Sequence, residues 1–417
     1  MHSTRLTAFL LLASNAAVLA SPILPSSLNT TCPTGLTGPN CTFYAVKPTL
    51  QTGPAGADGD DPTVWVSDRH ARDSVVITTN KKGKQGLFVF DLEGKQKQFV
   101  EAGKPDNVDI LYDVRFGKKK VDLAVTACRT DDTLCFFQIE DGKLNAIDGG
   151  VQPVEPGFEV YGSCVYQSPQ TRKSYVFVNS KTSEYLQYEI LSSNDALNNC
   201  NANLTSPGPR QKHPKSTPTL RTTLVRRFNV GTGGQVEGCV TDSLHGHLYA
   251  SEESHGLWRF PAEPTSPPTP YLVDTLTTNG GHMYRDVEGV TLFHGKRGSG
   301  YILVSLQGVN AYAVYTRAAV PVYLFTFSIV ADPAKGIDEV TETDGLHVQA
   351  TGMGSFGKGL LVVHDDHRDP TAEDPNPETT FKYVSWESIA EHPLLPKALR
   401  LQSNPGYDPR KWDKAEN

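Results

Sequence analysis

Five carboxylates stand at matching places in the chain, each at or just before the start of an apolar run. They are Asp61, Asp109, Glu237, Glu288 and Asp344, and Asp60 precedes the first of them. If these acids converge in the fold, they cannot all stay ionised unless cations lie among them. Because no cysteine or histidine recurs beside them, the ligands on offer are hard oxygens, which favour calcium over zinc or copper. The alternative is that each acid accepts hydrogen bonds from backbone N–H groups of its own repeat.

A second set of polar side chains follows the next apolar run of each repeat, and it is divided by charge. The first three repeats offer Lys81, Lys82, Arg129 and Lys181, and the last three offer Glu253, Gln307 and Asp365. Cations and acids that face each other across one opening suit a phosphate clamped between basic side chains and bound calcium. Arginine supplies a two-pronged fork and lysine a point charge. For Lys81 and Lys82 alone, a solvated pair at a turn is the simpler interpretation.

The elements that must position these residues are short strands. The segments 287–293, 301–306 and 312–315 are apolar runs bounded by glycine and polar turns, which is typical of consecutive antiparallel strands. Six such repeats follow one another at roughly fifty residues, with one longer step, and Tyr161 takes the acid's place in the third. The pattern predicts an all-β fold, a six-bladed β-propeller of four-stranded antiparallel blades. Since innermost strands line a propeller's axis, the matched residues should meet at one mouth.

The chain divides by composition into four segments. Residues 1–20 have the form of a secretory signal peptide, with a positive start, a short apolar run and a small-residue end. Residues 21–54 are expected to form a cysteine-bracketed loop, and the strand Phe43–Val46 is expected to close the last blade, which removes an exposed edge. Residues 55–400 hold the propeller and residues 401–417 a polar tail.

Composition and targeting indicate a secreted, soluble, monomeric glycoprotein. Sequons begin at Asn29, Asn40 and Asn203. After the signal, no apolar run is long enough to span a bilayer. The net charge of -7 comes without any basic run, which argues against a nucleic acid partner.

The cysteine count fits an oxidising compartment. Seven cysteines would leave one unpaired if the others form disulfides. Cys32 and Cys41 bracket a loop and are the easiest pair to assign. Cys128 with Cys135 and Cys164 with Cys239 are the other expected pairs, which leaves Cys200 as the odd one. No spacing of cysteine and histidine suggests zinc.

Ten segments, in order from about residue 57 to the end, carry a family resemblance. They are 60–65, 78–83, 107–109, 159–162, 236–238, 252–253, 285–289, 305–308, 343–345 and 381–387. In these segments the chain resembles the beta-propeller phytases, calcium-dependent phosphatases of myo-inositol hexakisphosphate (phytate). The resemblance implies a phosphoric monoester hydrolase of the 3-phytase type, with phytate as its small-molecule substrate. It also implies direct hydrolysis by metal-activated water without a covalent intermediate.

The resemblance and the carboxylate pattern together imply two groups of site residues. For catalysis and phosphate binding these are Lys81, Lys82, Arg129, Tyr161 and Lys181, with Glu237 orienting the attacking water. For several calcium ions they are Asp60, Asp61, Asn107, Asp109, Glu237, Glu253, Asp286, Glu288, Gln307, Asp338 and Asp344. Asp61 and Asn107 would serve structural calcium nearby.

The chain also departs from the family pattern. Thr182 stands where the family commonly has an acid, and His347 replaces another. Ala57 and Gly59 occupy further acidic positions, although Asp58 offers a substitute. These departures leave open a weak or inactive calcium-stabilised propeller that acts as a binding module. Such a protein would keep the carboxylates but would need no basic set.

Other hydrolase chemistries fit less well. The segment 69–72 partly matches a histidine acid phosphatase motif, but it lacks the required glycine and arginine spacing and is expected in a surface turn. No cysteine phosphatase loop and no serine hydrolase elbow is present. Asn80 and Asn107 would suit a lactonase-type propeller, which would not explain the four basic residues.

Overall fold

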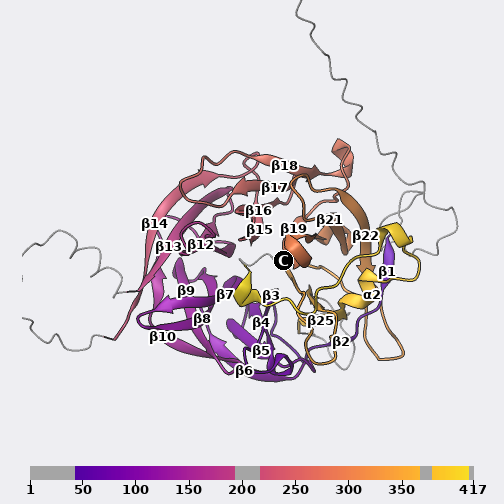
Figure 1. The fold of residues 1–417 in the computed structure, drawn as a ribbon, viewed down its shortest axis with the longest axis horizontal. Coiled ribbons are helices and arrows are strands. Elements are labelled where there is room, and N and C mark those ends of the chain that lie inside the picture. The colour runs from indigo at the N-terminus through magenta and orange to yellow at the C-terminus, as the bar shows by residue number, and fades with distance from the viewer. Residues whose placement is uncertain (1–42, 193–216, 367–377, 413–417) are drawn as a thin grey trace, which may run out of the picture.

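The computed structural model describes residues 43–192, 217–366 and 378–412. Their regular structure is almost entirely β and forms six small antiparallel sheets in a ring (Figure 1). The first strands of successive blades contact one another in turn around the axis. The prediction of a six-bladed propeller is therefore confirmed. Over the described residues, no helix combines the length and the apolar composition needed to cross a bilayer.

The first three blades each consist of four strands that are consecutive in the chain. Blade 1 contains β3 (Gly59–Trp65), β4 (Val75–Asn80), β5 (Gly86–Phe90) and β6 (Gln96–Glu101). Blade 2 contains β7 (Pro105–Phe116), β8 (Lys119–Cys128), β9 (Thr133–Glu140) and β10 (Lys143–Pro153). Blade 3 contains β11 (Ser163–Gln167), β12 (Ser174–Asn179), β13 (Glu184–Ser192) and β14 (Leu220–Asn229).

The last three blades include the strands that close the ring. Blade 4 contains β15 (Val236–Asp242), β16 (His247–Glu252), β17 (Gly256–Pro261) and β18 (Tyr271–Thr275). Blade 5 contains β19 (Val287–His294), β20 (Gly300–Leu306), β21 (Ala311–Thr316) and β22 (Tyr323–Ile329), and blade 6 contains β23 (Leu346–Gln349), β24 (Leu360–Asp365) and β25 (Thr380–Ser385). The helical pieces are α2 (Trp386–Ala390) and the 3-10 turns 71–73, 277–279, 296–298, 307–309, 397–399 and 409–411.

Two strands from the N-terminal segment complete blades 5 and 6. β1 (Tyr44–Val46) pairs in parallel with β22 and makes blade 5 five-stranded. β2 (Leu50–Gln51) pairs antiparallel with β25 and is the fourth strand of blade 6. The expectation that Phe43–Val46 closes the last blade is therefore wrong, because β2 completes that blade and β1 adds to blade 5. A single short segment thus ties two neighbouring blades together.

The middle strands are buried on both faces because each blade packs between two others. Every residue of β4, β5, β12 and β24 is buried, whereas β6 lies at the rim and is largely exposed. Strands covered on both faces read as continuous apolar runs rather than as alternating ones. The apolar clusters accordingly lie between blades; one of them joins β19 and β20 to Phe43 and Leu257.

Side chains of the inner strands bind the backbone of the next blade. An Asp61 oxygen accepts a hydrogen bond from Val108 N at 3.1 Å, and an Asp109 oxygen accepts one from Val165 N at 3.2 Å. The alternative had each acid serving its own repeat, but these acids connect adjacent repeats. They fix how each blade is rotated against the next.

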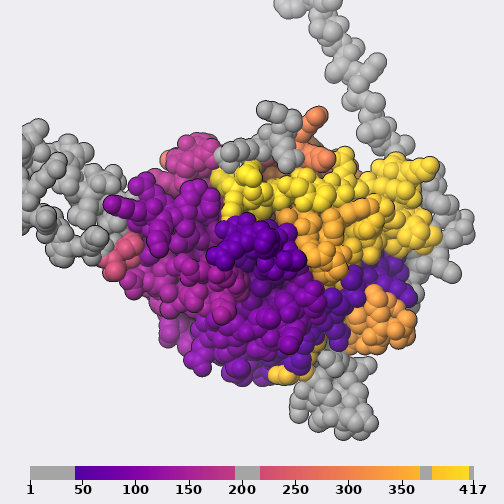
Figure 2. Space-filling view, turned by 60° about the horizontal axis from the view of Figure 1, so that its bottom comes forward, coloured from indigo at the N-terminus to yellow at the C-terminus, as the bar shows by residue number. Residues whose placement is uncertain are grey.

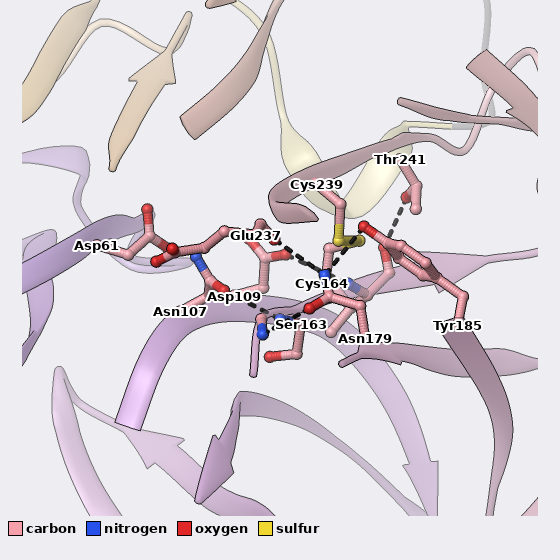
Figure 3. Close-up of a disulfide and its surroundings, with 12 residues drawn as sticks. Asp61, Asn107, Asp109, Ser163, Cys164, Asn179, Tyr185, Glu237, Cys239 and Thr241 are labelled. Carbon is pink, nitrogen blue, oxygen red and sulfur yellow. Dashed lines mark hydrogen bonds between the residues drawn. A yellow bond between two sulfur atoms is a disulfide. The ribbon is translucent and has the colours of Figure 1, made fainter. Parts of the chain in front are cut away.

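Two of the expected disulfides are present. Cys128–Cys135 joins β8 to β9, and Cys164–Cys239 joins the inner strands of blades 3 and 4 (Figure 3). Cys32, Cys41 and Cys200 lie outside the described residues, as do the predicted signal peptide and all three sequons. Two disulfides are typical of a protein that folds in an oxidising compartment.

The C-terminal segment is packed rather than a loose polar tail. Trp386 stacks on Phe293 at 4.0 Å between ring centroids, and Tyr407 stacks on His294 at 4.7 Å. Tyr407 and Trp412 also line a cavity of about 140 Å³ among the inner strands. In Figure 2 this yellow segment spreads over one face beside indigo and orange residues. The segment therefore covers the axial cavity.

Asp242 and Arg317 form a buried ion pair between blades 4 and 5. Two guanidinium nitrogens each lie 2.6 Å from a carboxylate oxygen, and both side chains are almost fully buried. Burial alone would raise the pKa of Asp242, but the hydrogen bonds from Arg317 and His245 outweigh it and hold that pKa below its ordinary value. The pair therefore stabilises the fold only while the carboxyl is ionised.

We predict that Asp242→Asn lowers the free energy of unfolding by about 3–5 kcal/mol at neutral pH, because the Arg317 charge stays buried without its partner. The folded-state pKa is depressed, so this stabilisation is present above the unfolded pKa of about 3.9 and is lost as the pH falls toward the folded value. Urea unfolding at several pH values should show the gap between wild type and variant narrowing in acid.

Glu391→Gln is the matched control. It removes an exposed carboxylate that lies 2.8 Å from Lys358, and it should leave the unfolding curve nearly unchanged. A wild-type advantage over Asp242→Asn that stays constant down to the most acidic point would contradict the assignment.

Candidate active site

Carboxylates from four blades meet at one mouth of the ring. Asp60, Glu237 and Asp344 each offer an oxygen within 4.8 Å of the others. Glu237, Glu253 and Glu288 form a second group at the same spacing, so Glu237 belongs to both. These five acids are separated by up to 284 positions in the sequence, and the fold gathers them.

The electrostatics of this cluster favour a bound cation. Burial, followed by the charge of Asp344, raises the pKa of Asp60 well above its ordinary value, and burial with Glu237 does the same to Glu288. Burial and Glu237 raise the pKa of Glu253 to about 7. Among the described residues, Asp60 Oδ1, Glu237 Oε1 and Glu288 Oε2 are buried without a hydrogen-bond partner. Carboxylate oxygens that face one another without donors are the arrangement a hard cation requires.

Basic side chains lie against this cluster. Lys81 Nζ is 2.5 Å from Asp60 Oδ2 and 3.9 Å from Asp344 Oδ2. The Arg129 guanidinium lies 4.8 Å from the centre of the Tyr161 ring, and Lys181 Nζ lies 4.4 Å from it. Lys81 and Arg129 keep 15% and 18% of their side chains exposed, so both reach solvent at the mouth.

Tyr161 links the basic side to the acidic side. Its hydroxyl donates a short hydrogen bond to Glu237 Oε2 and accepts one from Gln235 Nε2 at 3.0 Å. Burial, together with Glu237, raises the pKa of Tyr161, so the hydroxyl stays a proton donor near neutral pH. The same residue therefore holds two cations over its ring and one carboxylate at its oxygen.

Other predicted ligands lie beside the two carboxylate groups. Asp61, Asn107 and Asp109 line the axial cavity, and Figure 3 shows them grouped with Glu237. The charge of Asp286 contributes to the raised pKa of Glu253 and of Glu288.

Asp338, Gln307 and Lys82 complete the predicted set. Asp338 pairs with the buried Lys382 at 2.5 Å, an ammonium that also contacts Asp365. Gln307 donates its backbone N–H to Asp286 O at 2.9 Å. Lys82 is exposed beside Lys81.

The departures from the family pattern occupy specific surroundings. A Cβ on Gly59 would lie 2.5 Å from Thr379 Cγ2, so blade 6 leaves no room for an acid there. Burial lowers the pKa of His347 to about 4, which keeps its ring neutral in the axial cavity. The Thr182 hydroxyl is 2.9 Å from that of Ser180, and Ala57 is exposed.

Sequence reasoning missed three polar residues of the site. Asp106 lies 2.7 Å from Arg129, Gln235 contacts Tyr161, and Asn179 ties the Tyr161 segment to the Glu237 strand. A signal existed only for Asp106, because Asp106-Asn107 matches Asp60-Asp61 in blade 1. The segment 69–72 is exposed, as expected, and Arg69 pairs with Asp141 at 3.0 Å.

Comparison with known proteins defines the family. The structure is a six-bladed propeller that gathers basic and acidic side chains at one mouth. A family model described as phytase matches residues 11–200 and 217–415. The chain is also 34% identical over 352 residues to the 3-phytase of Bacillus subtilis (strain 168), covering 83% of this chain and 84% of that protein. The chain therefore belongs to the phytase family and is a phosphoric monoester hydrolase.

A solved structure of different sequence shows only a loose likeness. The crystal structure of BBS1N in complex with ARL6DN, soaked with lead, matches with a TM-score of 0.42 and 9% identity. The match covers 82% of this chain and 80% of that chain. The score is too low to carry an argument.

The side chain of Asn179 connects several parts of the site, and replacing it tests how much these hydrogen bonds stabilise the fold. Its side chain accepts from Gly162 N at 2.8 Å and donates to Tyr185 and to Glu237 O, both at 3.0 Å. We predict that Asn179→Ala lowers the free energy of unfolding by about 1–3 kcal/mol, because the buried Gly162 N and Glu237 O lose their hydrogen-bond partner. Urea unfolding measures this. Asn145→Ala, at an exposed position, is the control, and equal effects of the two changes would contradict the assignment.

Proposed function

We propose that this protein hydrolyses phosphate monoesters of phytate and that it depends on calcium to do so. The observation that carries the proposal is the Tyr161 junction, where two cations lie over the ring and the hydroxyl is bonded to Glu237. It places the basic residues beside the carboxylate cluster, as a clamp for a phosphate group needs. The membership in the phytase family supports the same substrate.

The carboxylate cluster fits calcium. Its oxygens are hard ligands, several are buried without donors, and no cysteine sulfur or imidazole nitrogen joins either group of acids. Asp60, Glu237, Glu253, Glu288 and Asp344 would hold the ions, with Asp286 and Gln307 at the edge. When bound, calcium supplies positive charge that offsets the charge of the substrate phosphate.

The side chains themselves bind and orient the substrate. Arg129 offers a bidentate fork to two phosphate oxygens, and Lys81 and Lys181 add point charges. Glu237 orients a water molecule for in-line attack on phosphorus. The water oxygen forms the new bond to phosphorus as the bond to the inositol oxygen breaks, without a covalent enzyme intermediate. Tyr161 contacts Arg129 and Lys181 through its ring and Glu237 through its hydroxyl, so it fixes the position of the phosphate-binding cations relative to Glu237.

The remaining expectations are part of the same proposal. Lys82, exposed beside Lys81, would contact a neighbouring phosphate of the same inositol ring. Asp61 and Asn107 would serve structural calcium, and Asp109 and Asp338 are the remaining expected calcium ligands. The protein is secreted and monomeric. A binding module would need the carboxylates but not Arg129 and Lys181 on Tyr161, so the basic set favours the enzyme.

We predict that purified protein releases phosphate from phytate in calcium and loses that activity in chelator. Lys81→Ala combined with Arg129→Ala should lower kcat/KM by about 10²–10³-fold, because both contact the charge that develops on the phosphate. Phosphate release measures both effects. Lys119→Ala is the control, since that exposed lysine lies at the opposite end of the strand that leads to Arg129. Full activity in chelator would refute the calcium dependence.

A second prediction needs no substrate. Calcium at one hundred times its dissociation constant should stabilise the fold by about 2.7 kcal/mol, seen as a rise in the thermal unfolding midpoint. Glu237→Gln should reduce that rise because Glu237 belongs to both carboxylate groups. Glu93→Gln, at an exposed turn, should preserve it. The assignment fails if Glu237→Gln keeps the full calcium-dependent rise.

A further inference from the structure

Blade 2 contributes an acid, Asp106, to the mouth. The spacing of the repeats had predicted Asp109 for this blade. Pro105 pairs with Cys128 and Val108 with Thr126, which places Asp106 and Asn107 together in a bulge. In blade 1 the same irregularity lies between Gly59 and Pro62 and contains Asp60 and Asp61. Asp106 is therefore the counterpart of Asp60, and Asn107, not Asp109, is the counterpart of Asp61.

The surroundings of Asp106 connect it to Arg129. Asp106 is fully buried, and its Oδ1 accepts a hydrogen bond from Arg129 Nη1 at 2.7 Å. The Arg129 guanidinium lies over the ring of Tyr161 and is partly exposed. The acid thus holds one edge of the guanidinium and the ring holds one face. An arginine has five N–H donors, so the hydrogen bond to Asp106 leaves others for an anion.

The backbone on both sides of this pair is fixed. Arg129 N donates to Lys104 O at 3.3 Å, and Thr79 of blade 1 donates its hydroxyl to Asp106 O at 2.6 Å. Cys128, the residue before Arg129, is bonded to Cys135. Neither member of the pair can shift without moving strands of two blades. A guanidinium held this way loses little freedom when it binds an anion, which favours binding.

Asp106 also differs from its counterpart in blade 1. Asp60 pairs with Lys81 and lies in a carboxylate group, whereas Asp106 belongs to neither group of acids. Its nearest charged partner is Arg129. Within the described part of the chain, its Oδ2 is buried without a hydrogen-bond partner, so the contact that assigns it a role is the hydrogen bond from Arg129, which points to orientation of the arginine.

We propose that Asp106 is a positioning residue, which orients the Arg129 guanidinium to receive a substrate phosphate and does not touch the substrate itself. The proposal rests on the proposed function, because it requires that Arg129 binds phosphate. It predicts that the effect of Asp106 on phosphate binding passes entirely through Arg129. A double-mutant cycle is the direct test of such a dependence.

The experiment compares Asp106→Asn, Arg129→Ala and the double variant. Asp106→Asn keeps the shape of the side chain but removes its charge, and it should lower kcat/KM on phytate by about 10–100-fold. The double variant should be no worse than Arg129→Ala alone. Calorimetric titration with inorganic phosphate should show the same pattern in Kd, which gives a readout independent of turnover.

Asp122→Asn is the matched control. Asp122 lies on β8 in the same blade and pairs with Arg410, near the opposite end of the strand. Its loss should lower stability but leave kcat/KM and phosphate affinity at wild-type values. If Asp106→Asn does not fold, the cycle is run with Asp106→Glu, which keeps the charge and should retain more phosphate affinity than Arg129→Ala.

The outcomes separate the two proposals. If wild type hydrolyses phytate but the effects of Asp106→Asn and Arg129→Ala multiply, Asp106 acts independently of Arg129 and the inference is overturned. Unchanged kinetics in Asp106→Asn overturn it as well. If wild type neither hydrolyses phytate nor binds phosphate, both the proposed function and this inference are refuted.

Discussion

Repulsion among buried carboxylates at one mouth of the ring is the constraint on which the rest of the site depends. Glu237 belongs to both carboxylate groups. Its oxygens lie close to those of Asp60 and Asp344 in one group and to those of Glu253 and Glu288 in the other. Charges this close and this buried stay ionised only with positive charge beside them. Lys81 and Arg129 supply part of it from within the chain.

The closed ring of the propeller holds these carboxylates in place despite their repulsion. Each inner strand is bound to the next through side chains such as Asp61 and Asp109, whose oxygens accept backbone N–H groups of the following blade. The acids at the mouth are therefore held by a closed ring, and no single blade can turn away to relieve the repulsion. Under the proposed function, this held repulsion is what a bound cation would relieve.

Sequence alone predicted the fold and which side chains come together at the candidate site. Six repeats with polar residues at matched places were enough to bring Lys81, Arg129 and Lys181 to the mouth that Glu237 occupies. The spacing of the repeats gave a wrong match where a β-bulge changes the register between two strands. A bulge places two residues opposite one, so counting from the apolar run matched Asp109 with Asp61, whose counterpart is Asn107, and missed Asp106, the counterpart of Asp60. The partner of Asp338, Lys382, comes from a strand 44 positions away and leaves no local pattern. Tertiary pairing also decided that Leu50–Gln51, and not Phe43–Val46, completes blade 6.

The Cys164–Cys239 bridge spans the part of the chain that contains the longest step between repeats. A proteolytic nick anywhere between these two cysteines leaves both fragments on one covalent molecule. The bond sits at the innermost strands of blades 3 and 4, so the fragments stay joined beside Tyr161 and Glu237. A cut within the long step between the repeats therefore leaves the two halves of the molecule tethered beside the candidate site.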